Sequence, residues 1–167
     1  MIFLFPSVIC TRCTDFFCLA IIKGPPNDIY FIIEEPFKHY LQKNFHTLYL
    51  AVDEDENVGA MFFVILPGLH PDNLGYDLNM EEEQLKLCAM MDTAVVLPEF
   101  RGHHLQYEMM QHAEEDLRQL GYQYLLCTVH PENVFSRSNV MKQGYKKMLT
   151  KEKYGGFLRD IWMKDII

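Results

Sequence analysis

The feature that most restricts the possible folds is an apolar run joined by a short turn to an amphipathic helix. The run is Leu87–Leu97, interrupted only by Asp92 and Thr93. Such a run is typical of a central strand buried on both faces, and we expect this strand to span Gln84–Leu97. After the turn, apolar residues recur at spacings of three and four: Leu105, Met109, Ala113, Leu117 and Leu120. Gly121 stands where a C-terminal cap belongs, so the pattern predicts a helix after the strand.

Hairpins and helices alternate along the rest of the chain. His46–Val52 and Val58–Leu66 read as two strands joined by the polar turn Asp53–Asn57. The other predicted elements are a strand at Met1–Cys10, a helical segment at Asp28–Phe45 broken at Pro36, a loop at Pro67–Met80, a strand at Tyr122–Val129, a short helix at Ser136–Gln143 and an antiparallel pair at Tyr145–Leu149 and Phe157–Met163. This mixture predicts an α/β sandwich with a mixed sheet. Because no repeat or linker interrupts the pattern, residues 1–167 are expected to form one domain.

Composition narrows the class of protein. The chain has 167 residues, of which 49% are hydrophobic and 23% charged, values typical of a soluble globular domain. A net charge of −8 repels phosphate backbones, so we expect no nucleic acid partner and an amine more readily than an anion. The apolar segment Met1–Cys10 is too short to span a bilayer and contains no basic residues. We therefore expect no membrane partner, and the odd number of scattered cysteines favours a reduced, cytoplasmic protein.

The cysteines and histidines give little reason to expect a metal. Five scattered cysteines do not form a disulfide framework, and the Cys10–Cys13 spacing has no second ligand pair nearby. His104 and His112 share a helix face, which could attract a metal, but no carboxylate stands at the spacing that a zinc site of this kind requires. We expect no metal and a solvent or loop role for these histidines.

The turn between strand and helix is the candidate site. A turn that enters a helix directs several free backbone N–H groups at one point, and the helix dipole adds partial positive charge there. Both features favour a diphosphate. The alternative is an ordinary connection that happens to contain Arg101 and Gly102, because one glycine is a weak signature.

Two motifs resemble a known family. The run Val95-Val-Leu-Pro-Glu-Phe-Arg101-Gly-His-His-Leu-Gln106 resembles the acetyl-CoA-binding motif of the GNAT superfamily, which reads Arg or Gln, two variable residues, Gly, one variable residue, then Gly or Ala. In the family this motif usually follows a strand that ends in Val-x-Pro-Glu-aromatic, and Val96-Leu-Pro-Glu-Phe-Arg101-Gly102 matches that lead-in closely. The run Val129-His-Pro-Glu-Asn133-Val-Phe-Ser136, followed by Gly144-Tyr145, resembles the family's segment after its fifth strand. The two motifs occur in the family's order. The resemblance covers residues 46–163 well and residues 1–45 only weakly.

The resemblance implies a GNAT-like α/β (α+β) fold with a mixed, mostly antiparallel central sheet flanked by helices. It also implies an acetyl-CoA-dependent N-acetyltransferase, in which a primary amine of a small molecule or peptide attacks the thioester directly. A homodimer is possible. The residues implied to bind the cosubstrate are Ala94, Val95 and Val96 for the pantetheine, Arg101, Gly102, His103, His104, Leu105, Gln106 and Tyr107 for the diphosphate, and Asn133 and Ser136 for the pantetheine or thioester.

The sequence also departs from the family pattern. His104 replaces the first glycine of the loop, and Gln106 replaces its final Gly or Ala. Val140 stands where the family often has a tyrosine general acid, and Thr128 stands where one subgroup has a glutamate base. These departures support an alternative function, a catalytically weak GNAT-like module that binds or senses acyl-CoA.

Asp92 is the candidate catalytic base. A carboxylate within an apolar run is expected to be desolvated, which favours proton uptake. Three alternatives remain: the strand is exposed at this point, the carboxylate serves a structural hydrogen bond, or water relays the proton. Two further expectations concern packing, namely that Met90, Met91, Met109 and Met110 fill the core and that Glu81–Glu83 and Glu114–Asp116 are solvated.

Overall fold

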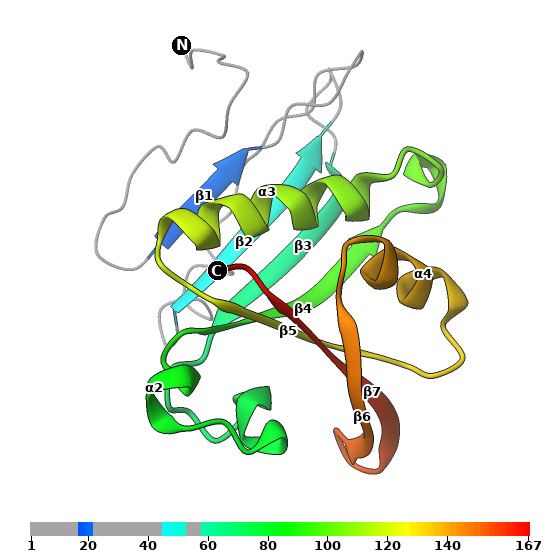
Figure 1. Ribbon diagram of the computed structural model, residues 1–167. Coiled ribbons are helices and arrows are strands. Elements are labelled where there is room, and N and C mark those ends of the chain that lie inside the picture. The colour runs from blue at the N-terminus through cyan, green and yellow to red at the C-terminus, as the bar shows by residue number, and fades with distance from the viewer. Residues whose placement is uncertain (1–16, 22–44, 53–57) are drawn as a thin grey trace. The chain divides into compact units, whose positions relative to one another are not determined.

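The backbone forms a mixed sheet with helices. The computed structural model describes residues 17–21, 45–52 and 58–167. These residues form a seven-stranded sheet with the order β1-β2-β3-β4-β5-β7-β6, as Figure 1 shows. The last two strands exchange places because β7, and not β6, pairs with β5. The predicted fold class, a mostly antiparallel mixed sheet with flanking helices, is confirmed.

The element bounds agree with most of the sequence predictions. The strands are β1 (Phe17–Ile21), β2 (Phe45–Val52), β3 (Val58–Leu66), β4 (Cys88–Val96), β5 (Tyr124–Val129), β6 (Lys146–Lys153) and β7 (Phe157–Asp165). The helices are η1 (Leu74–Leu78), α2 (Glu82–Leu85), η2 (Pro98–Phe100), α3 (Leu105–Gln119) and α4 (Val134–Lys142). The predicted strand at Met1–Cys10 lies outside the described residues, as does the predicted helix at Asp28–Phe45 except for Phe45, which begins β2.

Residue contacts divide the fold into two compact units. The first contains β1, β2, β3 up to Ile65, and the segment Thr93–Ala113. In this unit β1 pairs in parallel with β2. Alternate residues of β3 are buried, and the Phe62 ring lies 6.2 Å from the ring of Tyr49 on β2. The period of two in β3 therefore reflects one face directed into the core.

The second unit contains Leu66–Asp92 and Glu114–Ile167. Here β4 pairs in parallel with β5 over only three residue pairs, which end at Met90–Leu126. Antiparallel pairing of β5 with β7, and of β7 with β6, completes this part of the sheet. The prediction of one domain over residues 1–167 stays a prediction.

The prediction for Gln84–Leu97 is only partly correct. Glu82–Leu85 forms the single turn α2, and the strand begins at Cys88. Residues 88–91 are buried, whereas residues 92–96 are exposed or half-buried. Burial on both faces thus ends where the pairing with β5 ends. The apolar composition of the run continues beyond this point, and composition alone does not reveal the change.

Methionines fill the core as the sequence predicts, and two cysteines are buried as well. Met90, Met91, Met109 and Met110 are all buried. Cys88 and Cys127 are free and buried, and burial raises the pKa of each thiol to about 12. Within the described part of the chain, no helix is both long and apolar enough to cross a bilayer.

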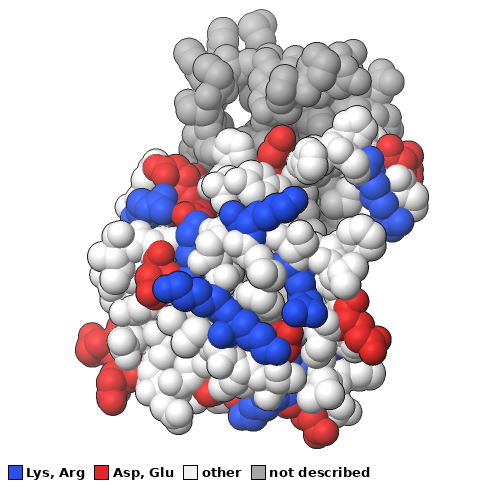
Figure 2. All heavy atoms as spheres, turned by 45° about the vertical axis from the view of Figure 1, so that its right-hand side comes forward, with Lys and Arg blue, Asp and Glu red and all other residues white. Residues whose placement is uncertain are grey.

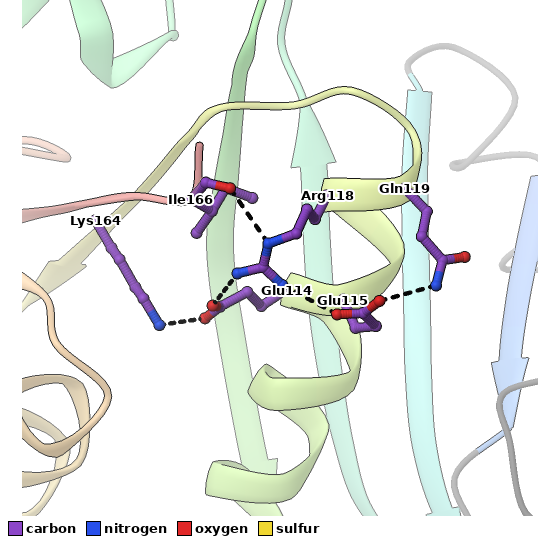
Figure 3. A network of polar contacts seen from close by, with 6 residues as sticks. All are labelled: Glu114, Glu115, Arg118, Gln119, Lys164 and Ile166. Atoms are coloured by element: carbon purple, nitrogen blue, oxygen red, sulfur yellow. Dashed lines mark hydrogen bonds and ion pairs between the residues drawn. The ribbon is translucent and has the colours of Figure 1, made fainter.

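Glu114 on α3 is buried and not solvated, contrary to the sequence prediction. Its carboxylate accepts hydrogen bonds from Arg118 at 2.8 Å and from Lys164 at 2.6 Å, as Figure 3 shows. Arg118 also donates to Glu115 and to the carbonyl oxygen of Ile166. Two cations replace the water that a buried carboxylate loses, so the second half of α3 is tied to the end of β7.

Charge is distributed unevenly along the chain. Residues 134–167 contain eight Lys or Arg and three Asp or Glu, whereas the whole chain has a net charge of −8. Figure 2 shows several of the chain's Lys and Arg side chains together on one face. The net charge of the whole chain therefore does not describe the charge of residues 134–167.

Candidate functional site

The second half of β4 carries the first group of predicted site residues. Ala94 and Val96 are half-buried and Val95 is 41% exposed. These residues follow the point at which the β4–β5 register ends. An extended ligand can pair with the backbone of a strand where its edge is open, so Ala94, Val95 and Val96 stay the predicted pantetheine contacts.

The turn after β4 is held against β3. The amide of Leu97 donates to the carbonyl oxygen of Gly59 at 2.9 Å. A Cβ placed on Gly59 would lie 2.4 Å from the ring of Phe100, so only glycine leaves room for that ring. The sequence analysis did not identify Gly59 as part of the site. A glycine inside a predicted strand is the signal that could have found it, since such a residue often marks a close approach.

The backbone of the turn adopts left-handed conformations at two positions. Gly102 has φ +87° and His104 has φ +58°. The His104 carbonyl oxygen accepts the amide of Glu108 at 3.1 Å, which places His104 at the N-cap of α3. The first glycine of the family motif corresponds to His104, and the positive φ explains why glycine suits this position. A residue with a Cβ here carries backbone strain of about 1–2 kcal/mol.

The first turn of α3 presents donors. Among the described residues, no acceptor bonds the amides of Leu105, Gln106 and Tyr107. Arg101, His103 and His104 precede them, and all three side chains are exposed. The Arg101 Nε also approaches the carbonyl oxygen of Val96 at 3.5 Å, which links the turn to the end of β4. The structure thus brings the predicted residues of β4 and the turn together in the first unit.

Asn133 and Ser136 meet at the start of α4, in the second unit. The Asn133 Oδ1 accepts the backbone amide of Ser136 at 3.1 Å, so Asn133 is the N-cap of α4. Asn133 is exposed and Ser136 is half-buried. The role that the contacts demonstrate for this pair is structural capping.

The prediction that Asp92 is desolvated is wrong. Asp92 is exposed on β4, directly after the buried residue Met91. It stands two residues beyond the last pair of the β4–β5 register, where burial of the strand has ended. Asp92 stays a candidate base because of its place at the end of the β4–β5 register, and not because it is buried.

Tyr154 is a candidate that the sequence analysis did not single out. Its hydroxyl lies 3.3 Å from the hydroxyl of Thr128 on β5. Tyr154 is in the turn between β6 and β7 and has φ +53°, which is uncommon for a residue with a side chain. Val140, which stands where the family often has its tyrosine, is 2% exposed and has no proton to give. A tyrosine beside two glycines in a hairpin turn is a weak local signal, and only the fold reveals its contact with β5.

No group of three or more His, Cys, Asp or Glu side chains among the described residues could hold a metal ion.

Comparison with known proteins establishes the family. The model of the acetyltransferase (GNAT) family matches residues 19–145, which is more than half of the chain. This chain belongs to the GNAT acetyltransferase family. A comparison with curated proteins gives no match.

Solved structures share the fold at low sequence identity. The ribosomal-protein-S18-alanine N-acetyltransferase from Escherichia coli is 14% identical, with a TM-score of 0.59 over 81% of this chain and 79% of that chain. A Bacillus subtilis acetyltransferase in complex with CoA is 10% identical, with a TM-score of 0.56 over 80% of this chain and 84% of that chain. Nourseothricin acetyltransferase is 17% identical, with a TM-score of 0.56 over 72% of this chain and 65% of that chain. The match therefore spans less than two thirds of the length of nourseothricin acetyltransferase.

Proposed function

We propose that the protein transfers an acetyl group from acetyl-CoA to a primary amine of a small molecule or peptide. The observation that carries this proposal is the open first turn of α3, where the amides of Leu105, Gln106 and Tyr107 lack acceptors among the described residues. Unpaired amides at a helix N-terminus suit a diphosphate. Family membership supports acetyl transfer as the reaction.

The residues present fit such a ligand. A Cβ on Gly102 would meet no atom within 4 Å, so the turn is open on that side. Arg101 can add positive charge near a diphosphate, and the exposed His103 and His104 can donate hydrogen bonds there. Backbone groups of Ala94–Val96 would hold the pantetheine as an added strand, and contact of Asn133 and Ser136 with the pantetheine or thioester stays a prediction. When bound, acetyl-CoA supplies an acetyl group already activated as a thioester.

The acceptor amine must lose a proton, since only its neutral form is nucleophilic. Asp92 is the proposed acceptor of that proton, directly or through water. Asp92→Asn keeps the shape and removes the basic group, so kcat/KM for an amine should fall by about 10²-fold while acetyl-CoA affinity stays within about threefold. An unchanged kcat/KM would assign the proton to water or to the amine's own ionisation.

The function is tested by two measurements on the intact protein. Titration calorimetry with acetyl-CoA should show saturable binding, and a panel of primary amines should give acetylated product and free CoA by mass spectrometry. Absence of acetyl-CoA binding would contradict the proposal.

The second candidate function is an acyl-CoA-binding or sensor module. The observation that favours it is the pair of side chains, His104 and Gln106, at positions where the family motif has small residues, together with Val140. Acetyl-CoA binding without amine-dependent release of CoA would favour this candidate over the enzyme.

A further inference from the structure

Helix α4 buries very little of its own surface. Of its nine residues only Val140 is buried, whereas Val134, Phe135 and Met141 are 62%, 87% and 58% exposed. A surface helix usually directs its apolar residues toward the core, and apolar residues gathered at the surface often mark a contact with another molecule. The helix lies beside the β6–β7 hairpin of the same unit, as Figure 1 shows.

An open hollow of about 360 Å³ runs along one face of α4. Its lining residues are Val134, Arg137, Ser138, Met141 and Lys142. They recur at spacings of three and four and therefore share one face of the helix, whereas Asn133 and Ser136, the predicted pantetheine or thioester contacts, belong to another face. Because one helix supplies the whole lining, the hollow cannot enclose a small molecule, but it can receive a side chain laid across it.

The hollow combines apolar walls with positive charge. Val134 and Met141 supply the apolar atoms, and Arg137 and Lys142 stand beside them. No Asp or Glu occurs in α4. An acidic ligand with one apolar group therefore finds both of its parts matched on this face.

Asp160 on β7 fixes the position of Arg137. The Arg137 guanidinium donates to the Pro131 carbonyl oxygen at 2.8 Å, and its Nε lies 3.9 Å from the Asp160 carboxylate. Lys147 on β6 binds the same carboxylate at 2.6 Å. Burial alone would raise the pKa of Asp160, but hydrogen bonds from Lys147 and Thr150 hold it below its usual range. One carboxylate thus lies between two cations, whose side chains remain 39% and 42% exposed, so the surroundings of the hollow stay positive.

The rest of this segment has the same sign of charge. Residues 134–167 contain eight Lys or Arg and three Asp or Glu, and Figure 2 shows several Lys and Arg side chains together on one face. Such a surface attracts and orients an acidic partner. A membrane fits less well, because lipid contact requires apolar side chains that project, whereas the apolar atoms of Val134 and Met141 line a hollow.

We propose that this face of α4 is a docking site for an acidic peptide segment of a partner protein. One apolar side chain of the segment sits between Val134 and Met141, and carboxylates on either side of it bind Arg137 and Lys142. Recognition thus combines a single apolar anchor with flanking charge, a common division of roles in peptide binding. The docking site goes beyond the proposed acetyl transfer and does not depend on it.

The test measures the fluorescence anisotropy of labelled peptides with the intact protein. The probes have the sequence Glu-Glu-Asp-X-Asp-Glu-Glu, where X is Leu, Phe or Ala. Fluorescein on the N-terminus leaves no free amine, so the probes cannot accept an acetyl group. The Leu or Phe probe should bind saturably, more weakly at higher salt, and at least about fivefold more tightly than the Ala probe. Absence of binding by both apolar probes up to about 1 mM protein overturns the proposal.

Two substitutions with matched controls locate the site. Lys142→Glu and Met141→Ser should each weaken binding by about fivefold or more. Lys146→Glu makes the same charge change at an exposed residue on the opposite face of the sheet from Lys147, and Leu120→Ser changes a similarly exposed apolar residue. Both controls should bind within about twofold of wild type, and all four variants should share its thermal unfolding midpoint. Equal losses in variants and controls contradict the proposal.

Three further measurements distinguish other occupants of this face. Sedimentation velocity tests for a second copy of the chain, and flotation with phosphatidylcholine vesicles, with and without phosphatidylserine, tests for a membrane. Self-association or vesicle binding that Lys142→Glu abolishes, without peptide binding by wild type, overturns the proposal. So does displacement of the peptide by saturating acetyl-CoA, which would assign the face to the cosubstrate. A protein that binds the peptide but not acetyl-CoA would keep this docking site and contradict only the proposed function.

Discussion

Helices α3 and α4 follow adjacent parallel strands, yet they begin in different ways. At α4 the Asn133 side chain accepts the amide of Ser136, and the Glu132 carbonyl accepts the amide of Val134. At α3 the N-cap residue is His104 in a left-handed conformation, and no described residue accepts the first three amides of that helix. The N-terminus of α4 is therefore capped by a side chain, whereas the first three amides of α3 have no acceptor among the described residues.

At the N-terminus of α3, backbone strain at His104 occurs together with amides that have no acceptor among the described residues. The N-terminus of α4 has neither feature. A helix that serves only the fold gains stability from a capping side chain. A start that must bind an anion has to keep its amides available, and the turn before it has to bring the backbone close. The difference therefore supports the assignment of the anion site to α3, and three substitutions can break or sharpen it.

The largest effect is expected from Gly102→Val. The φ of +87° at Gly102 excludes a β-branched residue, so the turn must change its path and acetyl-CoA affinity should fall by at least about tenfold, or ~1.4 kcal/mol. Titration calorimetry measures the change. Gly121→Val is the matched control at the other end of α3, because Gly121 has the same φ of +87° and equally open surroundings. The control should lose stability while keeping its affinity, and equal affinity losses in both variants would refute the assignment.

A smaller effect is expected at the start of α4. Asn133→Ala removes the acceptor for the Ser136 amide and should destabilise the protein by about 1 kcal/mol, a shift of about 2–4 °C in the unfolding midpoint. Asn133→Asp keeps a capping oxygen and should stay close to wild type in stability. If Asn133 also donates to acetyl-CoA, both variants should lose affinity, because neither retains the amide NH₂. Unchanged affinity in both would leave capping as the whole role of Asn133.

The smallest effect is expected from His104→Gly, and its sign is opposite. Glycine relieves strain of about 1–2 kcal/mol at the positive φ, but it costs about 0.5–1 kcal/mol in unfolded-state entropy. The net result should be a gain of about 0.5 kcal/mol, detectable as a higher midpoint in denaturant unfolding. Asn133→Gly should instead cost a few tenths of a kcal/mol. A loss of stability in both variants would show that the two helix starts are equivalent.

The strands and helices could largely be predicted from the sequence because their periodicity is local. The period of two in β3 and the spacing of apolar residues in α3 each depend on neighbours within a few residues. The turn at Arg101–His104, which leads into α3, could be predicted for a similar reason, since the signal lies in one continuous motif.

Contacts between distant segments could not be predicted. Glu114 is buried because Lys164, fifty residues away in the chain, neutralises it. Asp92 is exposed because the register with β5 ends two residues earlier, and Thr128 meets Tyr154 only because the β6–β7 hairpin folds back. No local pattern contains these distances, so the sequence indicates which residues could act but not which of them meet.

The contact between Gly59 and Phe100 limits how this turn could be exchanged between proteins. A loop graft that transfers residues 97–104 from a relative would also transfer whatever side chain that relative has at position 100. The graft would fit only if residue 59 on β3, outside the transferred segment, left space for that side chain. In the reverse direction, this turn placed on a scaffold with any larger residue at position 59 would require a second substitution on a different strand before its backbone could close.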